Sequence, residues 1–258
     1  MNRRLIFYML IFDAFFIAGI LLYLEMDWYW ALLGFLIPLG FIALASSQIQ
    51  WNFFLSAIHS GQASGNKISL TFDDGPHPVY TPQVLDFLKT QDAKATFFLI
   101  GKNVKQYPYL VERIVKEGHT IGNHSYSHSK TIDFKSKNNW LKELNETDSE
   151  IQKITGKQPR FFRPPFGVTT PHLASAIEKT KHLVIGWNVR SFDTTKTSPE
   201  KINRKILAQT KSGSIILLHD RHENIVPILE QLLPELASKS YTFVTVNELI
   251  DEKSYVEI

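Results

Sequence analysis

Apolar residues are concentrated in two long runs at the beginning of the chain. Residues 5–24 read LIFYMLIFDAFFIAGILLYL and residues 28–45 read WYWALLGFLIPLGFIALA. Each run is long enough to cross a bilayer as a helix, and its many Leu, Ile and Phe residues outweigh the cost of Asp13, about 3 kcal/mol. A cleaved signal peptide is the competing interpretation, but its apolar region should be shorter. The pattern therefore favours a transmembrane helical hairpin over residues 1–46, bound to membrane lipid.

Charge around the hairpin does not settle on which side of the membrane the rest of the chain lies. Arg3 and Arg4 favour a cytoplasmic N-terminus, and two crossings would then return the chain to the cytoplasm.

The segment after the hairpin has two interpretations. Residues 47–66 include Trp51 and Phe53, which suit a helix lying in the membrane interface and equally a linker helix that packs on the following domain. The Gly/Ser/Asn-rich stretch SGQASGNK closes this segment. We expect the boundary near Asn66 and a single soluble domain over residues 67–258.

In residues 67–258, short apolar runs alternate with longer amphipathic ones. The runs that predict strands are 67–72, 95–101, 119–123, 160–164, 182–189, 214–219 and 241–246. Helical patterns lie between them, for example residues 81–91, with Thr81 at the expected N-cap, and residues 139–156, which end on a capping glycine. About seven strands separated by helices predict a parallel α/β architecture, either a barrel or an open sheet.

Composition narrows the classes of function only slightly. The formal net charge of the 258-residue chain is +3, which is too mild to indicate nucleic-acid binding. The chain has no cysteine, which excludes disulfides and thiolate chemistry. Nothing in the sequence points to an obligate protein partner.

Polar residues follow the predicted strands at their carboxyl ends, where both parallel architectures gather their ligands. These residues are Asp73 and Asp74 after the first strand, His124 after the third, Arg163 in the fourth, Asp193 after the fifth and His219 at the end of the sixth. Residues placed at random would not follow strand polarity so consistently.

Asp74, His124 and His128 form a candidate metal site. The two histidines of NHSYSH are four residues apart, a spacing that lets both imidazoles reach one ion, and a carboxylate with two imidazoles is a recurring catalytic ligand set. Neighbours on an extended chain point to opposite sides, so Asp73 would stay unligated and take a proton from metal-bound water. Taken alone, the two aspartates could be turn residues and the histidines a surface pair.

Two further groups could complete an acid–base site. In FFRPPFG, Arg163 would keep Asp73 ionised, and the rigid amide of Phe166 could bind an oxyanion, although a Pro-rich turn with an exposed arginine fits the same letters. In IILLHD, His219 could protonate a leaving amine while Asp193 orients its imidazole, although a structural histidine is the common alternative.

Taken in order, these motifs resemble those of the polysaccharide deacetylase family, the NodB-homology or carbohydrate esterase family 4 enzymes. The motifs are TFDDGP, HSYSH, RPPFG, a separate aspartate and LLH, and together they cover roughly residues 67–246. The resemblance implies a distorted (β/α) barrel and hydrolysis of the N-acetyl group of N-acetylhexosamine residues in a polysaccharide. It also implies a divalent metal cofactor, Zn²⁺ first, with Co²⁺ or another divalent ion as alternatives.

The resemblance also assigns roles by position. The metal ligands are Asp74, His124 and His128, the base is Asp73 held by Arg163, the acid is His219 held by Asp193, the oxyanion donor is the Phe166 amide, and the acetyl methyl contacts Leu217. Thr194 stands where the family usually has Trp, and Arg190 where an Asp is often seen. These departures concern the pocket wall and the substrate preference.

With the hairpin, the resemblance leads to a membrane-attached deacetylase of cell-wall glycan. The expected substrate is the N-acetylglucosamine or N-acetylmuramic acid of peptidoglycan, which lies outside the membrane, so we expect a multi-pass protein with an extracytoplasmic catalytic domain. The alternative is a membrane-attached glycan-binding or scaffold protein that keeps the fold without turnover.

Overall fold

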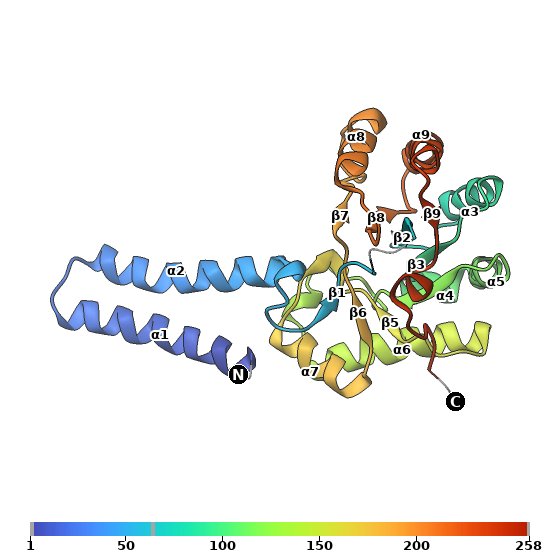
Figure 1. Ribbon diagram of the computed structural model, residues 1–258. Helices are drawn as coiled ribbons and strands as arrows, with labels where there is room; N and C mark the ends of the chain where they lie inside the picture. The colour runs from blue at the N-terminus through green and yellow to red at the C-terminus, as the bar shows by residue number, and fades with distance from the viewer. Residues whose placement is uncertain (1–2, 63–64, 257–258) are drawn as a thin grey trace.

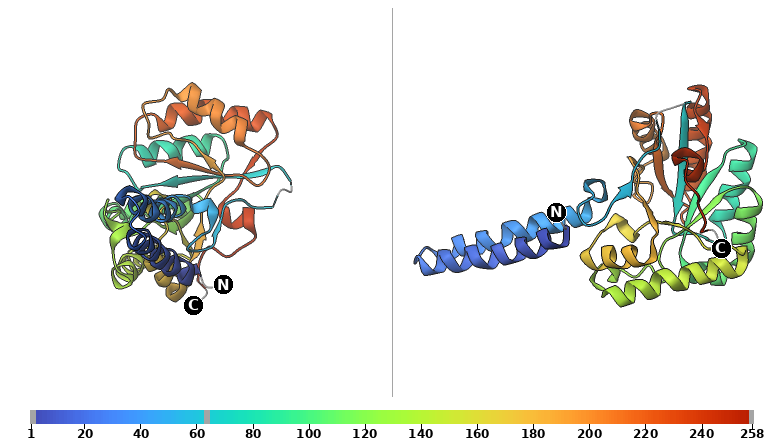
Figure 2. Two further views of the ribbon diagram at one scale, coloured as in Figure 1. Left: turned by 90° about the vertical axis from the view of Figure 1, so that its left-hand side faces the viewer. Right: turned by 60° about the horizontal axis from the view of Figure 1, so that its bottom comes forward.

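The structure, a computed structural model, describes residues 3–62 and 65–256 (Figure 1). A pair of helices, α1 (Arg3–Tyr23) and α2 (Trp28–Ser47), extends from one side of a β/α domain. The start of α1 and the end of α2 lie at the same end of this hairpin, next to the domain (Figure 1). The right-hand view of Figure 2 also shows the hairpin extending away from the domain.

Both hairpin helices are long and apolar enough to cross a membrane. Only 6% of residues 6–23 and 11% of residues 28–47 are buried, so neither helix is the core helix of a soluble domain. Large apolar side chains such as Phe12 and Ile37 face outward along the hairpin. The chain therefore has two N-terminal apolar helices with the length and exposure of membrane spans or of a signal segment.

The domain is built on a sheet whose nine strands, in the described part of the chain, all pair in parallel. Its order is β1-β6-β5-β4-β3-β2-β8-β7, and β9 pairs with β2. The strands are β1 (Ala57–Ile58), β2 (Lys67–Asp73), β3 (Ala95–Leu99), β4 (Thr120–Asn123), β5 (Phe161–Phe162), β6 (Leu183–Ile185), β7 (Val189–Arg190), β8 (Ile215–His219) and β9 (Thr242–Phe243).

Helices cover the outside of this sheet (Figure 1). They are α3 (Tyr80–Thr90), α4 (Gly101–Gln106), α5 (Pro108–Lys116), α6 (Lys137–Thr155), α7 (Pro171–Thr180), α8 (Pro199–Gln209), α9 (Ile225–Ser238) and α10 (Val246–Ile250), with 3₁₀ turns η1 (Ile49–Trp51), η2 (Ile132–Phe134) and η3 (Pro165–Gly167). The β/α order and the parallel pairing confirm the predicted (β/α) fold, in the form of a half-barrel.

One predicted strand is in fact two, and these two strands lie toward opposite ends of the sheet. Residues 182–189 read as a single apolar run, but β6 pairs with β5 at one end of the sheet and β7 pairs with β8 at the other. The break lies at Gly186, where any Cβ would come within 2.3 Å of the His59 ring. A glycine is therefore needed for the chain to leave β6 beside this ring and cross to β8.

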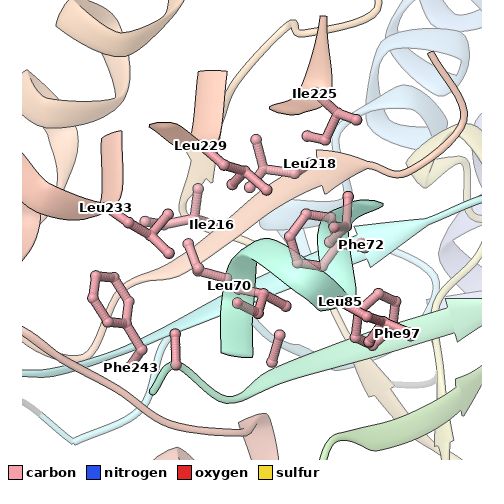
Figure 3. Close-up of a cluster of buried hydrophobic side chains, with 14 of the residues drawn as sticks. Leu70, Phe72, Leu85, Phe97, Ile216, Leu218, Ile225, Leu229, Leu233 and Phe243 are labelled. Carbon is pink, nitrogen blue, oxygen red and sulfur yellow. The ribbon is translucent and has the colours of Figure 1, made fainter. Parts of the chain in front are cut away.

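The main core lies between β2, β3, β8 and the helices α3 and α9 (Figure 3). Its labelled members are Leu70, Phe72, Leu85, Phe97, Ile216, Leu218, Ile225, Leu229, Leu233 and Phe243. Alternation along β2 sends Leu70 and Phe72 into this core and turns Thr71 and Asp73 to the opposite face, inside the half-barrel. The same periodicity thus builds the core and delivers polar groups to the interior.

Residues 49–60 pack on the domain and contribute to its sheet. Ile49, Phe54 and Leu55 are buried in a second apolar cluster, and β1 pairs with β6. The sheet therefore begins before the boundary expected near Asn66. The sequence did not predict β1 because a two-residue strand in an aromatic segment gives no period-2 signal.

Two predicted helices are present with shifted starts. The helix expected over residues 81–91 is α3, and Thr81 lies inside it rather than at its N-cap. The Thr81 hydroxyl instead accepts from the His77 amide and donates to the buried Asp220 carboxylate. The helix expected over residues 139–156 is α6, and it ends on Gly156 in the left-handed conformation as predicted.

Candidate active site

The register of the parallel strands brings the site residues to one end of the half-barrel. Asp73 at the end of β2 is the register partner of His219 at the end of β8. Asn123, which precedes His124, is the partner of Phe162, which precedes Arg163. Residues far apart in sequence therefore meet because their strands end together.

The carboxyl ends of the strands open into a cavity of about 150 Å³. Its walls hold Asp73, Asp74, His124, His128, Phe166, Gly167, Trp187, Arg190, Phe192, Thr194, Leu217, His219 and Arg221. Seven of the nine candidate residues line this cavity, and the remaining two, Arg163 and Asp193, lie behind Asp73 and His219.

Asp74, His124 and His128 have the geometry of a metal-ligand set. Asp74 Oδ1 lies 3.5 Å from His124 Nε2 and 3.1 Å from His128 Nε2. The same oxygen is buried without a hydrogen-bond partner, as expected of an atom whose natural partner is an ion. His124 Nδ1 lies 2.8 Å from the Arg163 carbonyl, which can only accept, so the Nε2 lone pair faces Asp74. The residues present fit a divalent ion.

The surroundings of His128 and Asp74 keep these two groups in their ligating forms. Burial lowers the pKa of the His128 imidazole to about 4, so this imidazole is neutral at neutral pH. Burial alone would raise the pKa of Asp74, but the nearby imidazoles of His124, His219 and His128 outweigh it and hold this pKa below its usual range.

The loop that carries the two histidines is fixed by α6. The Glu143 carboxylate accepts hydrogen bonds from the backbone amides of Tyr126 and Ser127, at 3.0 and 2.7 Å. Lys135 Nζ lies 2.6 Å from the same carboxylate and balances its charge. These contacts hold the loop between His124 and His128 in place before any ligand binds.

Several site residues have left-handed backbones, which L-residues rarely adopt. Asp74, His128 and Phe166 have φ values of 76°, 45° and 57°. Gly167 follows at φ 71°, and a Cβ there would lie 2.4 Å from the Trp187 ring. Such conformations cost about 1–3 kcal/mol each and concentrate at functional sites, because the surrounding packing must hold them.

Asp73 and Arg163 form a buried ion pair beside the metal-ligand set. Arg163 is fully buried, and its Nη1 donates to Asp73 Oδ1 at 2.8 Å and to Thr71 Oγ1 at 2.7 Å. Asp73 Oδ2 lies 3.8 Å from His124 Nε2. Asp73 thus stays outside the three-ligand set but borders it.

His219 shares one carboxylate with a second histidine. Asp193 Oδ1 lies 2.8 Å from His219 Nδ1, and Asp193 Oδ2 accepts from the His219 amide at 2.7 Å and lies 3.1 Å from His222 Nε2. Burial lowers the pKa of His219, but the hydrogen bond and charge of Asp193, with the charges of Asp73 and Asp74, outweigh it and raise this pKa to about 9. His219 is therefore protonated at neutral pH.

Sequence reasoning missed four residues of this site. Arg221 Nε lies 2.9 Å from Asp74 Oδ2, and His222 contacts Asp193 from the same loop. Trp187 and Phe192 form an aromatic wall of the cavity. Arg221 and His222 follow a motif histidine within three residues, and that proximity was the available signal.

Comparisons with known proteins agree with this geometry. The polysaccharide deacetylase family model matches residues 60–185. A peptidoglycan-N-acetylglucosamine deacetylase of Bacillus cereus is 39% identical over 194 residues, which are 72% of this chain and 89% of the relative. The peptidoglycan-N-acetylmuramic acid deacetylase PdaA of Bacillus subtilis is 34% identical over 202 residues, 76% of each chain.

A solved structure is also similar. The crystal structure of the Bc1960 peptidoglycan N-acetylglucosamine deacetylase, bound to a substituted N-hydroxybenzamide, superimposes with a TM-score of 0.72 at 32% identity, covering 76% of this chain and 93% of the other. The identity and the coverage are high enough to show family membership as well as fold. The chain belongs to the polysaccharide deacetylase family, whose NodB-homology domain defines the carbohydrate esterase family 4 enzymes.

Proposed function

We propose that this protein is a metal-dependent peptidoglycan deacetylase that removes the N-acetyl group from N-acetylglucosamine or N-acetylmuramic acid residues. One observation carries the proposal: the partnerless Asp74 Oδ1 lies beside two imidazole Nε2 atoms, while its neighbour Asp73 is held by a fully buried arginine. Asp74 can therefore bind the metal ion while Asp73, one residue away, is left to act as a base. Metal-dependent hydrolysis of an amide uses a carboxylate in each of these two roles.

Asp74, His124 and His128 would hold the divalent ion. Two imidazoles and one carboxylate match Zn²⁺, which takes three protein ligands in catalytic sites, and the set also suits Co²⁺. When bound, the ion would supply a Lewis acid for water and for the acetamido carbonyl.

The other residues would supply proton transfers. Asp73 accepts the proton of the attacking water, and the Arg163 guanidinium holds this carboxylate in place through its hydrogen bond to Oδ1. Water adds to the amide carbon, the C–N bond breaks, and acetate leaves as His219 donates its proton to the amine nitrogen. The Asp193 carboxylate orients the His219 imidazole and keeps it charged. The Phe166 amide would stabilise the oxyanion, and Leu217 would contact the acetyl methyl group.

Acetate release by the full chain in detergent tests the proposal. We expect release from peptidoglycan, loss of release after chelation, and recovery when Zn²⁺ is added. The variant Asp73→Asn should lose release while glycan binding survives. Absence of metal-dependent release from any N-acetylhexosamine glycan would overturn the proposal.

A second candidate function is glycan binding without turnover. The observation in its favour is Thr194, which lines the cavity where the family usually places a Trp wall. Equal behaviour of the wild type and Asp73→Asn in release and in binding would favour this alternative.

We further propose that the hairpin anchors the enzyme in the cell membrane with its domain outside. The start of α1 lies at the same end of the hairpin as the domain, so two full crossings would place the N-terminus and the domain on the same side (Figure 1). Peptidoglycan lies outside, which favours an external domain over the cytoplasmic location favoured by Arg3 and Arg4. External protease should cleave the domain in intact cells, and complete protection would contradict this location.

A further inference from the structure

Arg190 lines the active-site cavity from β7, the strand at one edge of the sheet. It ends β7 and is the register partner of Leu217 on β8, so the two side chains leave the sheet on the same face. Both residues line the cavity of about 150 Å³. Arg190 therefore stands beside the position proposed for the acetyl group.

Aromatic rings hold the Arg190 guanidinium in place. Its Cζ lies 4.8 Å from the Phe192 ring centroid and 5.8 Å from that of Trp187. These cation–π contacts restrain the group while leaving its N–H donors available. Lys205 Nζ lies 3.6 Å from the Phe192 centroid and adds a second positive charge nearby.

Arg190 differs from the other two arginines of the site in having no acidic partner. Arg163 pairs with Asp73 and Arg221 with Asp74, whereas no carboxylate of the described residues lies within ion-pair distance of Arg190. Arg190 is an exposed residue, and an unpaired guanidinium at the wall of a reaction cavity is suited to bind an anion on the substrate.

We propose that Arg190 binds a carboxylate of the substrate and makes the enzyme prefer N-acetylmuramic acid to N-acetylglucosamine. This inference rests on the proposed deacetylase function. Muramic acid carries a lactyl ether on the ring carbon next to the one that bears the acetamido group. Where no stem peptide is attached, its carboxylate is free, lies only a few bonds from the scissile amide and can enter the same cavity, whereas N-acetylglucosamine has a neutral hydroxyl there.

The test compares kcat/KM of the full chain in detergent on three oligomers: one with a free lactyl carboxylate, the same oligomer as its methyl ester, and an N-acetylglucosamine oligomer. The wild type should prefer the free carboxylate, and Arg190→Gln should lower kcat/KM on it by about 10-fold or more, the effect of losing one charge-assisted pair. The other two substrates should change by less than about twofold. Arg190→Lys should keep part of the preference.

Lys142→Gln is the matched control, because it removes one positive charge from an exposed position on α6 whose partner is Glu146. It should leave all three rates unchanged. Equal loss on all three oligomers with Arg190→Gln, or no loss on any, would overturn the inference.

A binding measurement separates this inference from the proposed function. If the wild type releases no acetate from any oligomer, the proposed function fails, but calorimetry of the three oligomers still tests Arg190. Weaker binding of the free carboxylate alone in Arg190→Gln would support the inference. Unchanged binding of that oligomer would overturn it.

Discussion

Replacing Asp73 with Asn should destabilise the protein strongly, because it leaves a buried guanidinium without its counter-charge. Arg163 is 0% exposed, and its other partners are all neutral: the Ile185 carbonyl at 3.1 Å, the Gly186 carbonyl at 2.8 Å and the Thr71 hydroxyl at 2.7 Å. These oxygens satisfy its N–H groups but do not neutralise its charge. The substitution keeps the shape of the side chain, removes the negative charge and replaces one oxygen with an NH2 group.

The size of the effect follows from this burial. Removing one partner of a buried ion pair costs about 3–5 kcal/mol. The Asn oxygen can still accept from Arg163 Nη1, so we take the lower value, about 3 kcal/mol. For a domain of this size, each 1 kcal/mol shifts Tm by about 2–4 °C, so the expected decrease is about 6–12 °C.

Thermal unfolding of the metal-stripped full chain in detergent measures this decrease without any contribution from metal binding. Glu146→Gln is the control, since it breaks an ion pair of 3.7 Å between side chains that are 73% and 43% exposed. Exposed pairs of this kind contribute about 0–1 kcal/mol, so its Tm should fall by less than about 4 °C. If Asp73→Asn shifts Tm no more than Glu146→Gln, the reasoning about the buried pair is wrong. Activity of Asp73→Asn must be measured well below its lowered Tm.

Two further predictions concern the acid and the glycine-containing turn. His219 must be protonated to donate, and its pKa is raised to about 9, so kcat/KM should fall as the pH rises through about 9. Asp193→Asn should move this fall to lower pH. If the alkaline side of the pH profile does not move, the role assigned to His219 and Asp193 is wrong. Gly167→Ala should lower the free energy of unfolding in urea by more than Gly156→Ala. Both glycines have φ 71°, but only Gly167 would bring a Cβ to 2.4 Å from Trp187, so equal losses would contradict this packing argument.

The position of the site could be predicted because the motif residues lie at the carboxyl ends of the predicted strands. Asp73, His124 and His219 each follow an apolar run that becomes a strand, and parallel pairing carries all three to one end of the sheet. The hydrophobic period was sufficient for this, since it depends only on neighbours along the chain.

Features that depend on distant contacts could not be predicted in the same way. Residues 182–189 form one apolar run, but β6 pairs with β5 and β7 with β8, and the His59 ring that approaches Gly186 between them is remote in sequence. The second histidine on Asp193 is likewise invisible locally, because His222 reaches that carboxylate only after the chain turns back from β8.

The hairpin and the catalytic loops are connected through direct contacts rather than through a free linker. The Thr169 amide, three residues after Phe166, donates to the Ser46 carbonyl in the last turn of α2 at 2.9 Å. The Gln50 side chain donates to the Trp187 carbonyl at 3.3 Å, and the Trp187 ring is part of the cavity wall. Three residues of extended chain span at most about 11 Å. Phe166 therefore lies no more than about that distance along the chain from Thr169, the residue that contacts the end of α2. A domain cut at the predicted boundary would lose both contacts together with β1, and for this reason activity assigned to the site has to be measured on the full chain.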